Sequence, residues 1–332
     1  MRFCGAVLLV GALSTITAAG PKTQSLGNGL FAYISDNAAS SNSVFLAGKE
    51  CILVVDTGFD GTAGEKLLRA IRAISPLPVR YIINTHYHRD HQAANGIVGP
   101  QAEIITTAFT RSATLAFLQN DLPRLKERLT GEALASLDSV AYRVATITTD
   151  KADIYIDNHP VHIEYRGPAH TMGDLIVEFP EQRVIATGDL FLNHSSPAMD
   201  HGRVLNWIQI LEQLLATPAQ TFVPGHFEVG SRQDLQRFHD YLAALRDQIS
   251  TQVKAGASWD EVARNLHMQA FSDFRQFPNF HATIKDNARV LYGEMKGEVD
   301  RSRKPEAGSA PARKPDPTKS ADLSGSSSQR YE

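Results

Sequence analysis

The stretch "NTHYHRDHQAAN" (residues 84–95) follows the apolar run "VRYII" and contains four side chains that bind metals. His86, His88, Asp90 and His91 fall within six positions. Burying so many imidazole and carboxyl groups without a compensating cation would cost considerable free energy. The run before them has the β-branched and aromatic composition of a strand, so we expect the four side chains in the turn that leaves its end. A bare H-x-H pair is weak evidence for a metal site, whereas H-x-H-x-D-H at a strand end is much stronger.

Three further strand ends lead into groups of the same kind. The run "VHIEY" leads through "RGPAH" to His170, "RVIAT" leads to Asp189, and "TFVP" leads to His226. Glycines accompany these groups, where a chain must turn sharply or approach something closely: Gly167, Gly188 and Gly225. Side chains presented from strand ends on one rim of a sheet can converge although they are far apart in sequence.

Seven such groups suit two metal ions. Three imidazoles make one site with room for water, a carboxylate and two imidazoles make a second, and a further carboxylate can bridge the two ions. Nitrogen and oxygen ligands without sulfur suit zinc, and they also allow iron or manganese. The sequence therefore predicts a small-molecule enzyme with a binuclear metal site.

The rest of the chain predicts alternating strands and helices. Strands are expected at "GLFAYISD", "SVFLAG", "CILVVD", "AEIIT", "ADIYID" and "LIVEF", in addition to the four ligand-bearing runs. Helices are expected after "CILVVD", over 108–140 with an interruption at Pro123, and around 204–215. Capping boxes at Ser231 and Ser258 predict two C-terminal helices. This alternation favours an α/β or α+β sandwich over a bundle or a barrel.

The two ends of the chain differ in composition from its middle. Residues 1–19 contain Arg2, an apolar run and then small residues, which predicts a signal peptide and export to the periplasm or the outside of the cell. Residues 301–332 are rich in Pro, Ser, Lys and Gly, which predicts a disordered tail. We therefore expect one domain over 20–300. Cys51 is the one thiol that would follow the signal, so no internal disulfide is expected.

Charge and hydropathy restrict the partners. A formal net charge of -3 gives no electrostatic argument for nucleic acid. The apolar run near the N-terminus is too short to span ~30 Å of hydrocarbon comfortably, so no stable membrane insertion is expected after cleavage of the signal. The sequence makes no prediction about the oligomeric state.

The motifs "VVDTG", "INTHYHRDHQAAN", "GPAHTMGD", "ATGDLF" and "VPGHF" resemble those of the metallo-β-lactamase superfamily over residues 25–246. The resemblance implies a four-layer αββα sandwich with the metal site at one edge, where the two sheets meet. It assigns His86, His88 and His170 to a first zinc ion. It assigns Asp90, His91 and His226 to a second, with Asp189 bridging and Asp56 supporting the ligands from behind.

The resemblance also implies a mechanism, namely hydrolysis of an ester, thioester, lactone or amide by a metal-bound hydroxide, with Asp90 as the catalytic group that orients it and shuttles a proton. Two alternatives stay open. A true β-lactamase is disfavoured because such enzymes of the superfamily generally have cysteine or serine where this chain has Asp189. A persulfide dioxygenase would use a single iron held by His86, His170 and Asp189.

Side chains around the predicted site are harder to assign. Tyr87 and Arg89 alternate with the ligands and are expected to point away from the metals or to line the pocket wall. Asn193, His194 and His201 lie in the loop "LNHSSPAMDHGR", and we interpret them as ordinary loop residues rather than substrate contacts.

Overall fold

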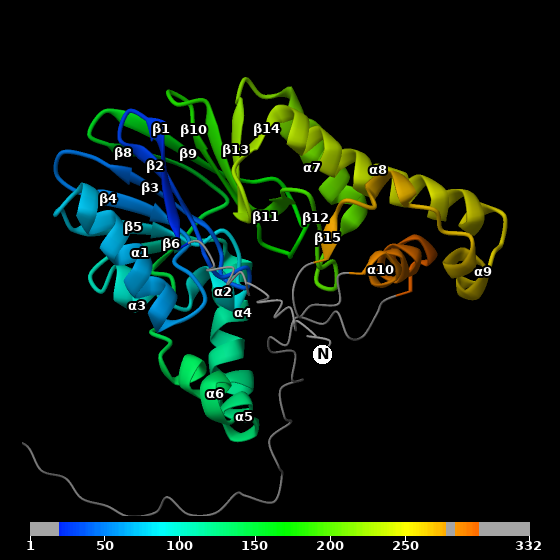
Figure 1. Cartoon of the computed structure of the whole chain (residues 1–332), viewed down its shortest axis with the longest axis horizontal. Coiled ribbons are helices and arrows are strands. Elements are labelled where there is room, and N and C mark those ends of the chain that lie inside the picture. Colours follow the sequence, from blue (N-terminus) through cyan, green and yellow to red (C-terminus); the bar gives the residue numbers. More distant parts are fainter. Residues whose placement is uncertain (1–19, 277–282, 299–332) are drawn as a thin grey trace, which may run out of the picture.

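The computed structural model describes residues 20–276 and 283–298, and they form two mixed β-sheets packed face to face with helices on both outer sides (Figure 1). This confirms the predicted four-layer αββα sandwich. The predicted signal peptide and tail lie outside the described residues and stay predictions. Within the described part of the chain, no helix combines the length and the apolar character needed to cross a membrane.

The first sheet has seven strands, of which the first four pair antiparallel and the last four pair parallel, with one strand common to both sets. In sheet order they are β1 (Lys22–Gly27), β2 (Leu30–Ile34), β3 (Ser43–Ala47), β4 (Ile52–Val55), β5 (Val79–Ile83), β6 (Glu103–Thr106) and β7 (Ile147–Thr148). The metal-binding stretch follows β5 directly.

The second sheet has six strands. In sheet order they are β14 (Gly230–Ser231), β13 (Thr221–His226), β11 (Val184–Leu192), β10 (Leu175–Phe179), β9 (His159–Tyr165) and β8 (Lys151–Ile156). Strands β11 and β13 run parallel to each other, so the groups at their carboxyl ends reach the same edge of the sheet. A separate two-stranded sheet pairs β12 (Ser195–Ser196) with β15 (Arg275–Gln276).

Helices cover the outer faces of both sheets and extend beyond them. They are α1 (Gly61–Ile74), α2 (Arg89–Gln92), α3 (Asn95–Val98), α4 (Ala108–Ala116), α5 (Leu122–Arg128), α6 (Gly131–Asp138), α7 (Val204–Ala216), α8 (Arg232–Lys254), α9 (Trp259–Arg264) and α10 (Ile284–Lys296). The capping boxes predicted at Ser231 and Ser258 are present and begin α8 and α9.

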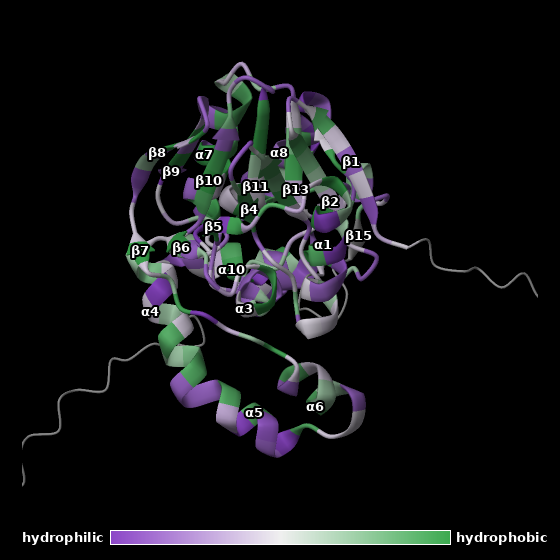
Figure 2. Ribbon diagram, turned by 90° about the vertical axis from the view of Figure 1, so that its left-hand side faces the viewer, coloured by the Kyte–Doolittle hydropathy of each residue, from purple (hydrophilic) through white to green (hydrophobic). Residues whose placement is uncertain are grey.

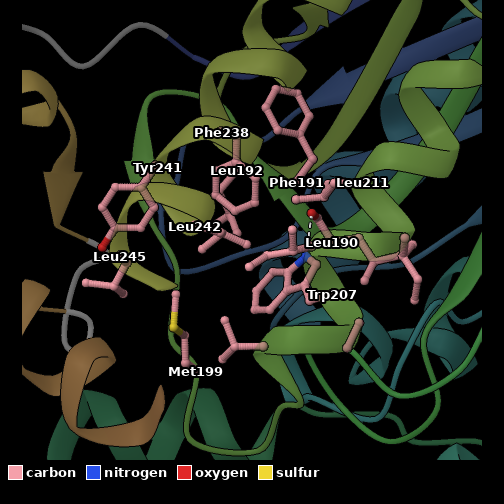
Figure 3. Packing of buried hydrophobic residues seen from close by; sticks show 14 of the residues in the cluster. Leu190, Phe191, Leu192, Met199, Trp207, Leu211, Phe238, Tyr241, Leu242 and Leu245 are labelled. Carbon is pink, nitrogen blue, oxygen red and sulfur yellow. Dashed lines mark hydrogen bonds between the residues drawn. The ribbon is translucent and has the colours of Figure 1, made fainter. Parts of the chain in front are cut away.

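Three apolar layers hold the sandwich together. Between the sheets lie residues such as Val44, Ile163 and Phe179, and α1 packs Leu67 and Ile71 on the outside of the first sheet. The third layer joins α7 and α8 to the second sheet around Trp207, whose Nε1 donates a 2.9 Å hydrogen bond to the carbonyl of Leu190 (Figure 3).

Several details differ from the sequence-based expectation, among them the following. Strand β1 was not predicted, because its alternating polar residues make only an exposed edge strand. The expected helical stretch 108–140 consists of α4, a π-helical turn at Phe117–Asp121, α5 and α6, and Pro123 sits in the first turn of α5 rather than breaking a helix. Helices α5 and α6 project from the sandwich as an arm (Figure 2).

The edge at which the two sheets meet is fixed by backbone hydrogen bonds. Leu175 N donates to Thr85 O at 2.8 Å, and Asn42 N donates to Gly225 O at 2.7 Å. Both bonds join the first sheet to the second beside the predicted ligands. The edge is therefore a rigid frame for any group placed there.

Candidate metal centre

The stretch 84–95 forms a closed loop after β5. Asn84 and Asn95 at its two ends exchange amide hydrogen bonds of 3.1 and 2.8 Å. Thr57 Oγ1 donates to Asn95 Oδ1 at 2.8 Å, which ties the loop to the end of β4. The paired amides explain why an asparagine stands at each end: they close the loop while its four ligand-type side chains face inward.

A first group of ring nitrogens converges at this loop. The Nδ1 atom of His88 lies 3.0 Å from His86 Nε2 and 3.0 Å from His170 Nε2. His86 and His170 are buried. With Asp189 these three residues offer four ligand atoms that all lie within 4.8 Å of one another, close enough to hold one metal ion.

A second group lies beside the first. His226 Nε2 is 3.0 Å from Asp90 Oδ2, and His91 Nε2 is 3.4 Å from the same oxygen. Together with Asp189 these buried residues offer a second set of ligand atoms within 4.8 Å of one another. The structure thus brings together all seven predicted ligands, in the two groups that the resemblance implied.

Asp189 lies between the groups and presents one carboxylate oxygen to each. Its Oδ2 is 3.3 Å from His170 Nε2, whereas its Oδ1 is 3.2 Å from His91 Nε2. The expectation that Asp189 follows the end of a strand is wrong, because β11 continues to Leu192 and contains it. A register shift at Gly188, where φ is +52°, turns the carboxylate toward the edge instead.

Gly225 makes room for this carboxylate, and Gly188 makes room for Thr85 beside it. A Cβ on Gly225 would lie 1.9 Å from Asp189 Oδ1, and a Cβ on Gly188 would lie 2.6 Å from Thr85 Oγ1. Any larger residue at position 225 would displace the carboxylate from its place between the groups. Gly188 and Gly225 therefore allow neighbouring segments to approach closely, and Gly188 also allows the turn of the backbone at this position.

The charge balance differs between the two groups. Burial, together with the neighbouring imidazoles, lowers the pKa of His86 and of His88 well below the usual histidine value. Burial alone would also lower the pKa of His91, but the carboxylates of Asp189 and Asp56 raise it well above that value. Burial would raise the pKa of Asp90, yet His91 and His226 hold it well below the usual range.

These protonation states suit a cation. The lowered pKa values of His86 and His88 favour neutral imidazoles, which is the form that binds a metal. In the second group the carboxylates around His91 favour a positive charge, and a divalent ion can supply that charge. Within the described residues, His91 Nε2 and Asp189 Oδ1 are buried and make no hydrogen bond of good geometry. Buried polar atoms rarely go unsatisfied, so these two fit a metal.

The ring nitrogens of His91, His86 and His226 that face away from the two groups make polar contacts with neighbouring residues. Asp56 Oδ2 accepts from His91 Nδ1 at 2.7 Å and from Thr85 Oγ1 at 2.8 Å. Thr85 Oγ1 also lies 3.1 Å from His86 Nδ1, and Ala38 O lies 3.1 Å from His226 Nδ1. Asp56 thus has the contacts expected of a residue that orients the ligands.

One contact was missed by the sequence analysis. His201 Nδ1 lies 2.9 Å from His88 Nε2, so His201 is in direct contact with a ligand-type residue. Burial lowers the pKa of His201 to about 4. No spacing signal connects His88 to a residue 113 positions later in an irregular loop, so only the fold could reveal the pair. His194 instead lies against Asp234 and Asp273.

A cavity of about 250 Å³ opens onto both groups. Its apolar wall consists of Phe59, Leu192 and Ala198. Its polar lining comprises His88, Arg89, Asp90, His170, Asp189, Asp200 and His201. No residue of the arm 122–138 lines it, and Arg89 is confirmed as a wall residue. The guanidinium of Arg89 stacks over the Phe59 ring at 3.9 Å.

Replacing Asp56 with asparagine tests this frame. Asparagine would keep the size of the side chain and tolerate the positive φ of +58° at this position. In the native protein Asp56 Oδ1 accepts from Thr85 N at 2.8 Å, while Oδ2 accepts from Thr85 Oγ1 and His91 Nδ1. Asparagine has one acceptor oxygen and would present its NH2 group to another donor, so Asp56→Asn should lower the free energy of unfolding by about 1.5–3 kcal/mol. Urea denaturation of the metal-free protein measures this. The exposed Asp153→Asn serves as the control, and equal stability of the two variants would contradict the assignment.

Comparison with known proteins agrees with this geometry. A family model described as the metallo-beta-lactamase superfamily matches residues 36–226, more than half of the chain. The chain is 25% identical over 236 residues to the 2,4-dinitroanisole O-demethylase subunit alpha of Nocardioides sp. (strain JS1661), covering 70% of this chain and 63% of that protein. It is 22% identical to the linear primary-alkylsulfatase of Pseudomonas sp. (strain ATCC 19151), covering 73% of this chain and 53% of that protein. The chain therefore spans less than two thirds of the length of both relatives.

The chain is also similar to a shorter metallo-beta-lactamase and to solved structures of this fold. The chain is 26% identical to metallo-beta-lactamase type 2 of Bacillus cereus, covering 63% of this chain and 76% of that one. A metallo-beta-lactamase from Pontibacter korlensis superposes with a TM-score of 0.55 at 17% identity, over 67% of this chain and 99% of that one. A double mutant of a sec-alkyl sulfatase superposes with a TM-score of 0.61 at 16% identity, over 81% of this chain and 50% of that one. The chain belongs to the metallo-beta-lactamase superfamily.

Proposed function

We propose that the protein is a binuclear zinc hydrolase that cleaves a carbonyl-type bond in an ester, thioester, lactone or amide. His86, His88 and His170 would hold one zinc ion, and Asp90, His91 and His226 the other. The observation that carries the proposal is the position of Asp189, which turns one oxygen to His170 and the other to His91 at 3.3 and 3.2 Å. One carboxylate shared in this way is suited to two cations rather than one.

Two bound zinc ions would supply a hydroxide nucleophile at neutral pH, because zinc lowers the pKa of a coordinated water from ~15.7 to ~7. The protein's own groups would position that nucleophile and move its proton. Asp90 lines the cavity, is buried, and has a pKa held well below the usual range by His91 and His226. An ionised carboxylate in this place can orient a water molecule and take up a proton, then return it to the leaving group.

The cavity limits the substrate. A volume of about 250 Å³ lies at the small end of ligand pockets, and the wall of Phe59, Leu192 and Ala198 is apolar. We therefore propose a small substrate with an apolar group beside the scissile bond. The same wall excludes water from one side of the bond and strengthens the electrostatic interactions on the other.

A second candidate function is hydrolysis of an alkyl sulfate ester, and Arg89 favours it. Arg89 lines the cavity, and its guanidinium donates a hydrogen bond to Ser136 Oγ at 3.0 Å and stacks over Phe59. A cation beside the metal groups suits a substrate that carries a negative charge. The similarity of this chain to a linear primary-alkylsulfatase, over 73% of its length, supports the same candidate.

Metal removal tests the core of the proposal. Complete chelation should abolish hydrolysis of an activated ester, and two equivalents of zinc per chain should restore it, because the nucleophile depends on the metal. Elemental analysis alongside the assay gives the stoichiometry. Hydrolysis that persists without metal would reject the mechanism. One ferrous ion per chain after anaerobic purification would favour the persulfide dioxygenase alternative.

Asp90→Asn tests the proton transfer. The variant keeps the size of the side chain but cannot accept a proton, so we expect kcat to fall by about 10²–10⁴-fold. Zinc content must be measured on the same sample, since Asp90 also faces the second group. A variant that retains two zinc ions and the wild-type kcat would remove Asp90 from the proposed mechanism.

A substrate panel separates the two candidate functions. We expect a carboxylic ester, a thioester or a lactone to be turned over faster than a β-lactam or an alkyl sulfate. Arg89→Gln should lower kcat/KM by about 10-fold or more for an anionic substrate, because a charge-assisted contact of ~1.5–3 kcal/mol is lost. The same variant should change kcat/KM for a neutral ester by much less. Fastest turnover of the alkyl sulfate, with this loss in the variant, would replace the first candidate by the second.

A further inference from the structure

His88 is held between the metal groups on one side and His201 on the other. Its Nδ1 faces the Nε2 atoms of His86 and His170, at 3.0 Å from each. Its Nε2 points the opposite way and lies 2.9 Å from His201 Nδ1. The two ring nitrogens of His88 therefore have separate tasks, and His201 is in contact with the one that does not face the metal groups.

The proton positions on both rings follow from this arrangement. A ring nitrogen that binds a cation does so through its lone pair, so a His88 bound through Nδ1 keeps its proton on Nε2. That N–H can only donate, and the atom that it meets is His201 Nδ1. His201 must then accept through Nδ1 and keep its own proton on Nε2, which makes it a neutral donor in the wall of the cavity.

We propose that His201 is a positioning residue that fixes the ring orientation and the tautomer of His88 for metal binding. The inference rests on the proposed metal centre but not on which bond the enzyme cleaves. His201 would then have the same role for His88 that Asp56 has for His91 and Thr85 has for His86. Groups that hold the outer nitrogen of a ligating histidine fix its orientation and raise its basicity.

The loop that carries His201 is built to keep it in place. Arg203 N donates to Ala169 O at 2.7 Å, directly before His170 in the chain. This approach requires a glycine at position 202, because a Cβ there would lie 2.4 Å from Ala169 O. Upstream, the loop is anchored by the pairing of β12 with β15. His201 is therefore fixed from both sides rather than free to adopt other positions.

The position of His201 has a consequence for the metal centre. The same side chain lines the cavity and contacts a metal ligand. A neutral imidazole is a weaker acceptor than the carboxylate that holds His91, because charge-assisted hydrogen bonds are roughly twice as strong. The affinity for the metal ion near His88 should therefore depend more on the surrounding residues than the affinity for the ion near His91.

Two substitutions at His201 separate the hydrogen bond from ring packing. His201→Phe keeps a ring of similar size but removes the acceptor, whereas His201→Asn places an amide oxygen near the position of Nδ1. Zinc affinity is measured by competition with a chromophoric chelator on the full chain. We expect His201→Phe to weaken binding of one of the two zinc ions by about 10–100-fold. His201→Asn should recover most of that loss. The control His162→Phe, at a half-buried position of β9 outside the metal centre, should bind zinc like the wild type.

A spectroscopic readout complements the affinities. Cobalt(II) in place of zinc should show altered visible absorption bands in His201→Phe and nearly wild-type bands in His201→Asn, because these bands report ligand orientation. Equal zinc affinity of His201→Phe and the wild type would overturn the inference, as would an Asn variant as weak as the Phe variant. A wild-type protein that binds no zinc would overturn the metal centre as well, whereas failure in the substrate panel would leave the role of His201 intact.

Discussion

The structure depends on one electrostatic constraint. Four buried imidazoles and the half-buried His88 gather with three buried carboxylates at one edge of the sandwich. Isolated charges in such surroundings would be very costly. The cost is reduced because the groups are arranged in complementary sets. The pKa values of His86 and His88 lie well below the usual histidine value, whereas Asp189, Asp56 and Asp90 around His91 raise its pKa well above that value. A pair of divalent ions would satisfy both sets at once.

Much of the surrounding architecture serves to hold this edge still. The two sheets are joined by backbone hydrogen bonds through Thr85 and Gly225, which adjoin His86 and His226. The buried Trp207 binds the carbonyl of Leu190, next to Asp189, and its ring lies 5.5 Å from that of His170. Packing in the third apolar layer is thereby coupled to the site. The ligands can be placed accurately because they lie on strands and on the short loops that leave them, which the core fixes.

The sequence predicted the strands better than the helices outside the sandwich. Runs such as "CILVVD" and "LIVEF" are buried on both faces, so their composition alone marks them as strands. The stretch 108–140 has apolar residues at helical spacing, but many of its leucines are only half-buried in an arm that leaves the body. Local periodicity cannot distinguish such an arm from a helix packed on the sandwich. The first strand was missed because an exposed edge needs no apolar pattern.

The sequence by itself pointed to the chemistry of the site, since the H-x-H-x-D-H stretch and three further groups beside glycines, His170, Asp189 and His226, already name all seven. It could do so because ligand identity is a property of side chains and their local spacing. Only the tertiary structure decided that Asp189 stands between the two groups and that His201 lies behind His88. Those facts depend on distances between segments that are far apart in the chain, and such distances are set by sheet register, by close approach at Gly202 and Gly225, and by packing of the core.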